Sequence, residues 1–111
     1  MESREQKLFG SRRRTEVLIL IALLGESYPT ELARLLDARL YSIQTIVRAL
    51  DREGILATRL SGSSRRVSLD PRYFAHKDLR NLLLRLAEAE PALGTAAARR
   101  RSRPRRAGKP M

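Results

Sequence analysis

The fold is decided by residues 29–54, which read PTELARLL, then DARLY, then SIQTIVRALDREG. The first part places three leucines on one helical stripe, and in the last part Ile46 and Leu50 recur at helical spacing. Each segment is too short to be stable alone and must bury its apolar face against another element. The apolar run from Val17 to Leu24 supplies that element, so we expect two short helices packed on a central one.

The flanking residues extend this pattern in both directions. Ser11 is a suitable N-cap for a helix over 12–24, and Gly25 ends it. Ser42 is predicted to cap the helix that ends before Gly54. Residues 55–60 and 65–69 alternate apolar and polar side chains around Ser61-Gly62-Ser63-Ser64, which predicts a hairpin. The expected fold class is therefore mainly α with a small β-hairpin wing, the order of a winged helix-turn-helix.

A further helix is predicted after the Asp70-Pro71 stop, from about Lys77 to Glu90. Its apolar seam would form a dimerisation helix with a second copy, because one small domain has little free core left to cover it. Packing of the seam on the chain's own first helix is the alternative. The seam consists of Leu79, Leu82, Leu83 and Leu86.

The expected organisation is an N-terminal arm (1–10), a winged helix-turn-helix domain (11–75), the dimerisation helix (76–91) and a disordered basic tail (92–111). The tail interpretation rests on its composition of small residues, arginines and prolines after Leu93, which we expect cannot bury a core. Between Arg99 and Lys109 the sequence has seven basic residues and no acidic one.

The formal net charge is +11, from 23 Lys and Arg against 12 Asp and Glu. Such an excess indicates a polyanionic partner, and beside a helix-turn-helix pattern it favours double-stranded DNA. A solvated tail that only maintains solubility is the alternative. The absence of cysteine excludes disulfides and thiolate metal sites. The apolar run is too short to cross a bilayer, so we expect a cytoplasmic protein with no membrane partner.

The third helix of the pattern would carry base-reading residues. With Ile46, Ala49 and Leu50 placed inward, the polar residues of this helix turn outward. Gln44 suits adenine and Arg48 suits guanine. Thr45, Ile43 and Val47 suit contact with a thymine methyl. Arginines on the hairpin would contact phosphates or a minor groove. A solvated helix face and protection of a strand edge are the respective alternatives. The predicted DNA-binding residues are Ser42, Ile43, Gln44, Thr45, Arg48, Arg52, Arg59, Arg65 and Arg66.

Catalysis, a cofactor and a metal site are not indicated by any residue pattern. His76 is the only histidine, and no set of further ligands converges on it in the sequence. The carboxylate pairs Asp51/Glu53 and Glu88/Glu90 are two residues apart in predicted helices, so the members of each pair point in different directions. Phosphate-binding glycine loops and nucleophile motifs are absent. We therefore expect a protein that is not an enzyme.

The run from Tyr41 to Leu56 resembles the recognition-helix segment of ArsR-like and MarR-like winged-helix repressors. There an apolar residue and a serine open the helix, and an acidic-Gly-apolar-apolar sequence leads into the wing. The resemblance implies transcriptional regulation as a dimer, with Ser42, Gln44, Thr45 and Arg48 at base-reading positions. Residues 31–36 lack the cysteine-bearing motif of the metal-sensing members, which excludes metal sensing through that motif.

A second resemblance covers residues 67–74 and 78–85, which are similar to winged-helix domains associated with small nucleotidyltransferases. The catalytic signature of those enzymes is missing from this chain. That likeness implies a stand-alone regulator or an antitoxin-like partner. Three hypotheses follow: a homodimeric, sequence-specific regulator on an inverted repeat, a protein-interaction module that docks on an enzyme, and a sequence-indifferent nucleic-acid binder driven by the tail.

Overall fold

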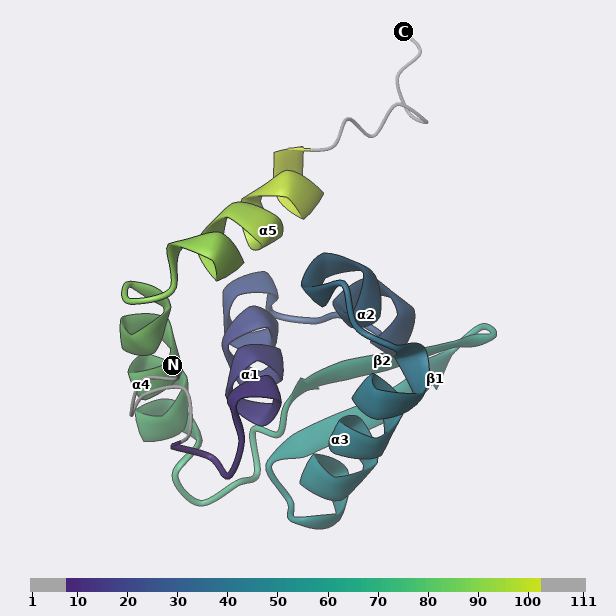
Figure 1. Cartoon of the computed structure of the whole chain (residues 1–111). Coiled ribbons are helices and arrows are strands. Elements are labelled where there is room, and N and C mark those ends of the chain that lie inside the picture. Colours follow the sequence, from purple (N-terminus) through teal and green to yellow (C-terminus); the bar gives the residue numbers. More distant parts are fainter. Residues whose placement is uncertain (1–7, 103–111) are drawn as a thin grey trace, which may run out of the picture.

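The computed structural model describes residues 8–102 (Figure 1). These residues form a mainly helical, winged-helix-like arrangement in which a two-stranded antiparallel hairpin follows the third helix, as the sequence predicts. In chain order the elements are α1 (Arg12–Leu24), α2 (Pro29–Leu36), α3 (Leu40–Arg52), β1 (Leu56–Ser61), β2 (Ser64–Leu69), α4 (His76–Ala87) and α5 (Pro91–Ser102).

Helix α1 is the centre of the molecule, with α4 on one side and α2, α3 and the hairpin on the other (Figure 1). Every side chain from Thr15 to Ala22 is buried, which matches a helix that is apolar nearly all round. The predicted cap is confirmed: the hydroxyl of Ser11 accepts a hydrogen bond from the amide of Arg14 at 3.2 Å. Gly25 ends the helix at φ 84°, a backbone conformation that favours glycine.

Helix α3 differs from the prediction at its start and in its buried face. It begins at Leu40, with Arg39 at the N-cap position, so Ser42 lies within the first turn and does not cap the helix. The fully buried residues are Ile43, Val47 and Leu50, whereas Ile46 and Ala49 are only half-buried. The predicted inward face was therefore rotated by about a fifth of a turn from the observed one, because apolar residues occupy more than one side of this helix.

The hairpin covers the core with alternate side chains. Leu56 pairs with Leu69 and Thr58 pairs with Val67, and of these four only Thr58 is not buried. Ser27 pairs with β2 through an isolated antiparallel bridge to Val67. Its amide donates to the carbonyl of Val67 at 2.9 Å, and the amide of Val67 donates to the carbonyl of Ser27 at 2.8 Å. This bridge fixes the loop before α2 against the wing.

Helix α4 packs against α1 within the same chain. Leu79 and Leu83 are buried there and Leu86 is half-buried, while Leu82 remains 40% exposed. The prediction that all four leucines form a self-pairing seam is therefore wrong for Leu79 and Leu83. The physical reason is that α1 is apolar on every side, so the face turned away from α2 and α3 also needs a cover.

Helix α5 corrects the prediction of a disordered tail for residues 92–102. Leu93, Ala96 and Ala97 are buried against α1, at spacings of three and four residues that place them on one helical face. The small alanine side chains let the two helix backbones approach closely. The rest of the predicted tail and the predicted arm before Leu8 lie outside the described residues.

The connection into α4 carries a perturbed carboxylate. The buried side chain of Asp70 accepts hydrogen bonds from the backbone amide of Arg72 at 2.8 Å and from its guanidinium at 3.3 Å. These bonds, the backbone one foremost, lower the pKa of the Asp70 carboxyl below its ordinary value. Among the described residues, no helix is long and apolar enough to cross a membrane.

Candidate nucleic-acid interface

The exposed side of α3 forms a continuous stripe, which we call the α3 stripe and define as Tyr41, Thr45, Arg48 and Arg52. The four residues follow helical spacings of four, three and four, so their side chains leave the helix on one face. The side chains of Arg48 and Arg52 make no hydrogen bond or ion pair with any residue that the structure describes. Their guanidinium groups are therefore available to an external acceptor.

Tyr41 is a member of the stripe that the sequence interpretation missed. Its side chain is 72% exposed, an unusual state for a large aromatic residue. The hydroxyl of Thr45 donates to the carbonyl of Tyr41 at 2.9 Å, so this hydroxyl already has a partner within the helix. The signal for Tyr41 was its position four residues before Thr45, but this became visible only once the helix start was known.

Of the other α3 residues predicted to read bases, Ser42 is exposed and Gln44 is half-buried. Ile43 is fully buried and cannot touch a ligand, which corrects its assignment to the interface. Val47, proposed for contact with a thymine methyl, is 3% exposed and likewise belongs to the core. The error follows from the wrong choice of inward face, because Ile43 and Val47 lie on the buried side of α3 together with Leu50.

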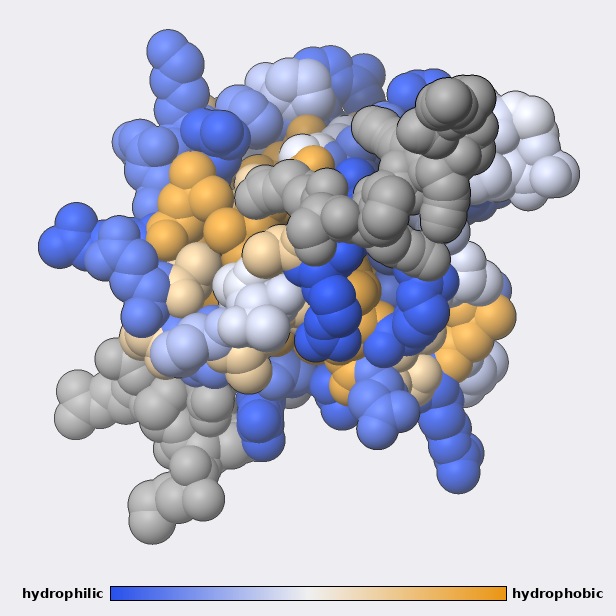
Figure 2. All heavy atoms as spheres, turned by 90° about the horizontal axis from the view of Figure 1, so that it is seen from above, coloured by the Kyte–Doolittle hydropathy of each residue, from blue (hydrophilic) through white to orange (hydrophobic). Residues whose placement is uncertain are grey.

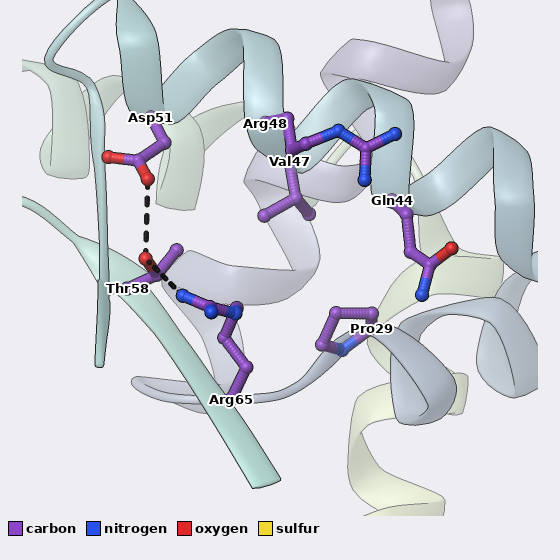
Figure 3. Close-up of a pocket in the computed structure, with 7 residues that line it drawn as sticks. All are labelled: Pro29, Gln44, Val47, Arg48, Asp51, Thr58 and Arg65. Carbon is purple, nitrogen blue, oxygen red and sulfur yellow. Dashed lines mark hydrogen bonds between the residues drawn. The ribbon is translucent and has the colours of Figure 1, made fainter. Parts of the chain in front are cut away.

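A hollow of about 400 Å³ lies between α3, the start of α2 and the hairpin (Figure 3). Gln44 and Arg48 border it from α3, and Arg65 borders it from the wing. The hydroxyl of Thr58 donates to a carboxylate oxygen of Asp51 at 3.2 Å and accepts from Arg65 at 3.3 Å. This chain of bonds links the wing to the end of α3 and holds Arg65 on the same side as the α3 stripe.

A second hollow of about 390 Å³ shares Gln44 and Arg65 and extends past Thr30 to the hairpin tip at Ser63. The two hollows together make a concave band beside α3, which the hairpin and the first turn of α2 enclose. Polar side chains and arginines border this band.

The three hairpin arginines do not form one group. Arg59 and Arg66 are opposite each other in the strand register and lie on the side turned away from Arg65. Arg59 forms an ion pair with Glu26 at 2.9 Å, and the guanidinium of Arg66 lies 5.0 Å from the ring centroid of Tyr28. Only Arg65 therefore shares a concave surface with α3.

Other cations are used inside the fold. Arg12 and Arg13 hold the carboxylate of Glu16 at 3.2 and 2.9 Å, and Arg14 reaches Glu53 at 2.9 Å. The net positive charge thus overstates how many arginines are free to meet a polyanion. Within residues 8–102, no group of His, Asp and Glu side chains is arranged to hold a metal ion.

The chain matches no protein-family model, and neither curated proteins nor solved structures gave a match. Its function must therefore be inferred from its own geometry and charge. The feature that stands out is the α3 stripe, where a helix presents two unpaired arginines beside a concave, arginine-bordered band.

Proposed function

We propose that the chain is a sequence-specific transcriptional regulator that binds duplex DNA, with α3 in the major groove. The observation that carries this proposal is the α3 stripe, in which Arg48 and Arg52 are exposed and unpaired among the described residues. An α-helix fits the width of the major groove, and an arginine directed at a base edge forms a bidentate contact with guanine. Thr45 presents a methyl group suited to thymine, and Ser42 lies one turn earlier.

The wing supports the same orientation of the DNA. With α3 in the groove, a sugar-phosphate strand would follow the concave band between α3 and the hairpin, where Arg65 and Gln44 offer donors. Arg59 and Arg66 lie on the other side of the hairpin, so under this proposal they contribute mainly through long-range charge. Under this proposal, Arg65 should therefore contribute more to DNA affinity than Arg59 or Arg66.

Homodimeric binding to an inverted repeat is part of the proposal, because one short helix covers only a few base pairs and a two-fold pair doubles the site. Leu82 is the predicted seam residue that remains exposed, and Phe74, just before α4, is 92% exposed. Contact between two copies at these residues would leave the α3 stripe free, since α3 lies on the far side of α1 (Figure 1).

The test is selection of bound duplexes from a random library by the full-length protein, followed by affinity measurements on the selected site. Arg48→Ala should weaken binding by about 1–3 kcal/mol, or roughly 5- to 150-fold, and relax preference at one position per half-site. The matched control is Arg80→Ala, which removes the same charge from an exposed position on α4.

The outcomes separate three cases. Weakening by Arg48→Ala that is equal on all duplexes would place Arg48 on a phosphate, so that bases are read elsewhere or not at all. An unselective library with a steep salt dependence would indicate a sequence-indifferent binder. Equal affinities for Arg48→Ala and Arg80→Ala would refute the assignment of α3.

A further inference from the structure

A second concave surface is formed by α2, α5 and the start of α1. Helices α2 and α5 run past each other there and leave two hollows, of about 400 and 610 Å³, that both border Leu35. Leu36 and Leu93 line the larger one beside Leu35. We call this surface the α2/α5 groove. It lies outside the concave band described above and shares no lining residue with it.

The floor of the groove is apolar, because it is formed by Leu35, Leu36 and Leu93, and arginines form its border. Five arginines line its two hollows, and Glu16 is the only acidic lining residue. Some of this charge is neutralised, because Arg12 and Arg13 pair with Glu16 and Arg100 pairs with Glu31. Even when Glu16 and Glu31 are both counted, five arginines stand against two carboxylates, so the border keeps a positive charge. Figure 2, seen from the α5 side, shows hydrophilic blue side chains standing around smaller orange areas.

Arg34 is the cation of this border that is most available. It is exposed, and its side chain forms no hydrogen bond or ion pair within residues 8–102. It lies one residue before Leu35, so a ligand that covers Leu35 brings its own flank next to this guanidinium. An anionic group on that flank would gain a charge-assisted contact.

The dimensions suit a short helix. The part of α5 that lines the groove, from Ala92 to Arg100, spans about 12 Å at 1.5 Å per residue, which is roughly two helical turns. Recognition of an amphipathic helix in such a groove relies on apolar side chains about one turn apart, with polar residues on the flanks. Because the border is basic, the matching flanks are acidic.

We infer that the α2/α5 groove binds an acidic amphipathic helix of a partner protein. The chain's own remaining C-terminal residues include Arg103, Arg105, Arg106 and Lys109, whose charge has the same sign as the border, and a second copy with a net charge of +11 is disfavoured for the same reason. Duplex DNA is a poorer occupant, because its phosphates could meet the arginines of the border but would leave the leucines of the floor uncovered, whereas an amphipathic helix covers them with its own apolar side chains.

The test uses the isotope-labelled full-length protein and a synthetic 14-residue peptide with leucines on one helical face and glutamates elsewhere. A scrambled peptide of the same composition is the control, since it keeps the charge but not the apolar face. We expect the ordered peptide to bind about tenfold more tightly or better, because only it can bury its leucines against the floor. Amide resonances of Leu35, Leu36 and Leu93 should shift on its addition.

Arg34→Glu should weaken binding of the ordered peptide by about fivefold or more, because it replaces an attraction with a repulsion. Arg80→Glu, the same charge reversal on α4, should weaken it less. Should Arg34→Glu lower the melting temperature strongly, Arg34→Ala supplies the same comparison without a new negative charge. Affinity for the selected DNA site should respond equally to Arg34→Glu and Arg80→Glu, which keeps this test separate from that of DNA binding.

Three results would overturn the inference. Equal binding of the ordered and scrambled peptides would show simple charge attraction, and resonance shifts confined to the α3 stripe would place the peptide elsewhere. Shifts of Leu35 and Leu93 on addition of duplex DNA, but not of peptide, would assign the groove to nucleic acid.

Discussion

Replacing Arg100 with alanine removes the cation that ties the end of α5 to the start of α2. Its guanidinium donates to both carboxylate oxygens of Glu31, at 2.9 and 3.3 Å, and to the carbonyl of Glu26 at 2.7 Å. The Glu31 side chain is only 3% exposed, and in the variant it would keep a single partner, the hydroxyl of Ser27 at 2.5 Å. A nearly buried carboxylate would then lack a cation.

The expected loss lies between two limits. A hydrogen bond to a charged group contributes about 1.5–3 kcal/mol, and breaking a fully buried ion pair costs about 3–5 kcal/mol. The Arg100 side chain is 32% exposed, so water can partly replace it, and we expect Arg100→Ala to lower the free energy of unfolding by about 2–3 kcal/mol. In a domain of this size that corresponds to a fall in Tm of roughly 8–20 °C.

The assay is thermal and urea unfolding followed by circular dichroism. The matched control is Arg85→Ala, which breaks the exposed pair with Glu88 and should change stability by no more than about 0.5 kcal/mol. Glu31→Gln in the Arg100→Ala background should restore part of the loss, because a neutral amide leaves no buried charge. A Tm for Arg100→Ala within about 2 °C of wild type would refute the reasoning.

Ending the chain after Glu90 removes α5 from the core and should cost at least about 3 kcal/mol in urea unfolding, and an unchanged midpoint would contradict the packing of this helix. Ending it after Ser102 should leave Tm unchanged and, under the proposed function, lower the slope of log affinity on log salt by up to about 3.6, because four basic residues are lost. Leu83→Ala should cost about 2–5 kcal/mol and Leu82→Ala less than about 1 kcal/mol; the reverse order would mean that α4 pairs with a second copy. Asp70→Asn should be less stable than wild type at neutral pH, and the difference should shrink below about pH 4, because a carboxylate whose pKa is lowered by folding stabilises only while ionised; melting curves in which the difference persists at about pH 2 would disprove this.

The helix-turn-helix and its wing were predictable because local signals agree with one another. Ser11 and Gly25 mark the ends of an apolar helix, and both act as expected. The alternation after Gly54 and the turn residues around Gly62 locate the hairpin. Where caps, turns and periodicity all point to the same element, tertiary packing has little left to alter.

The face of α3 was not predictable in the same way. Apolar residues stand at positions 43, 46, 47, 49 and 50, so a stripe can be drawn through more than one set of them. The choice depends on how α3 packs against α2 and β1, which is a tertiary property. A rotation of about a fifth of a turn moved Ile43 from the predicted interface into the core and left the start of the α3 stripe, at Tyr41, unnoticed.

Helix α5 was not predicted because the composition of this segment is typical of a disordered tail and its apolar face is narrow. Arginine and alanine are both good helix formers, and Leu93, Ala96 and Ala97 recur at the spacing of a narrow apolar face. That face is too small to predict burial alone, since two of its three side chains are alanines. It becomes decisive only against a helix that is apolar on every side, and α1 is such a helix.

The charge counted in the sequence also differs from the charge that the fold leaves available. The sequence shows a strong basic excess, yet the fold pairs Arg12 and Arg13 with Glu16, Arg59 with Glu26, and Arg100 with Glu31. A cation that already has a carboxylate partner must break that contact before it can hold a phosphate, so its gain on binding DNA is reduced. Under the proposed function, recognition therefore depends on the arginines that folding leaves unpaired, and the two on the α3 stripe share one helical face. Specificity should consequently be far more sensitive to changes at Arg48 and Arg52 than to equal changes of net charge elsewhere on the described surface.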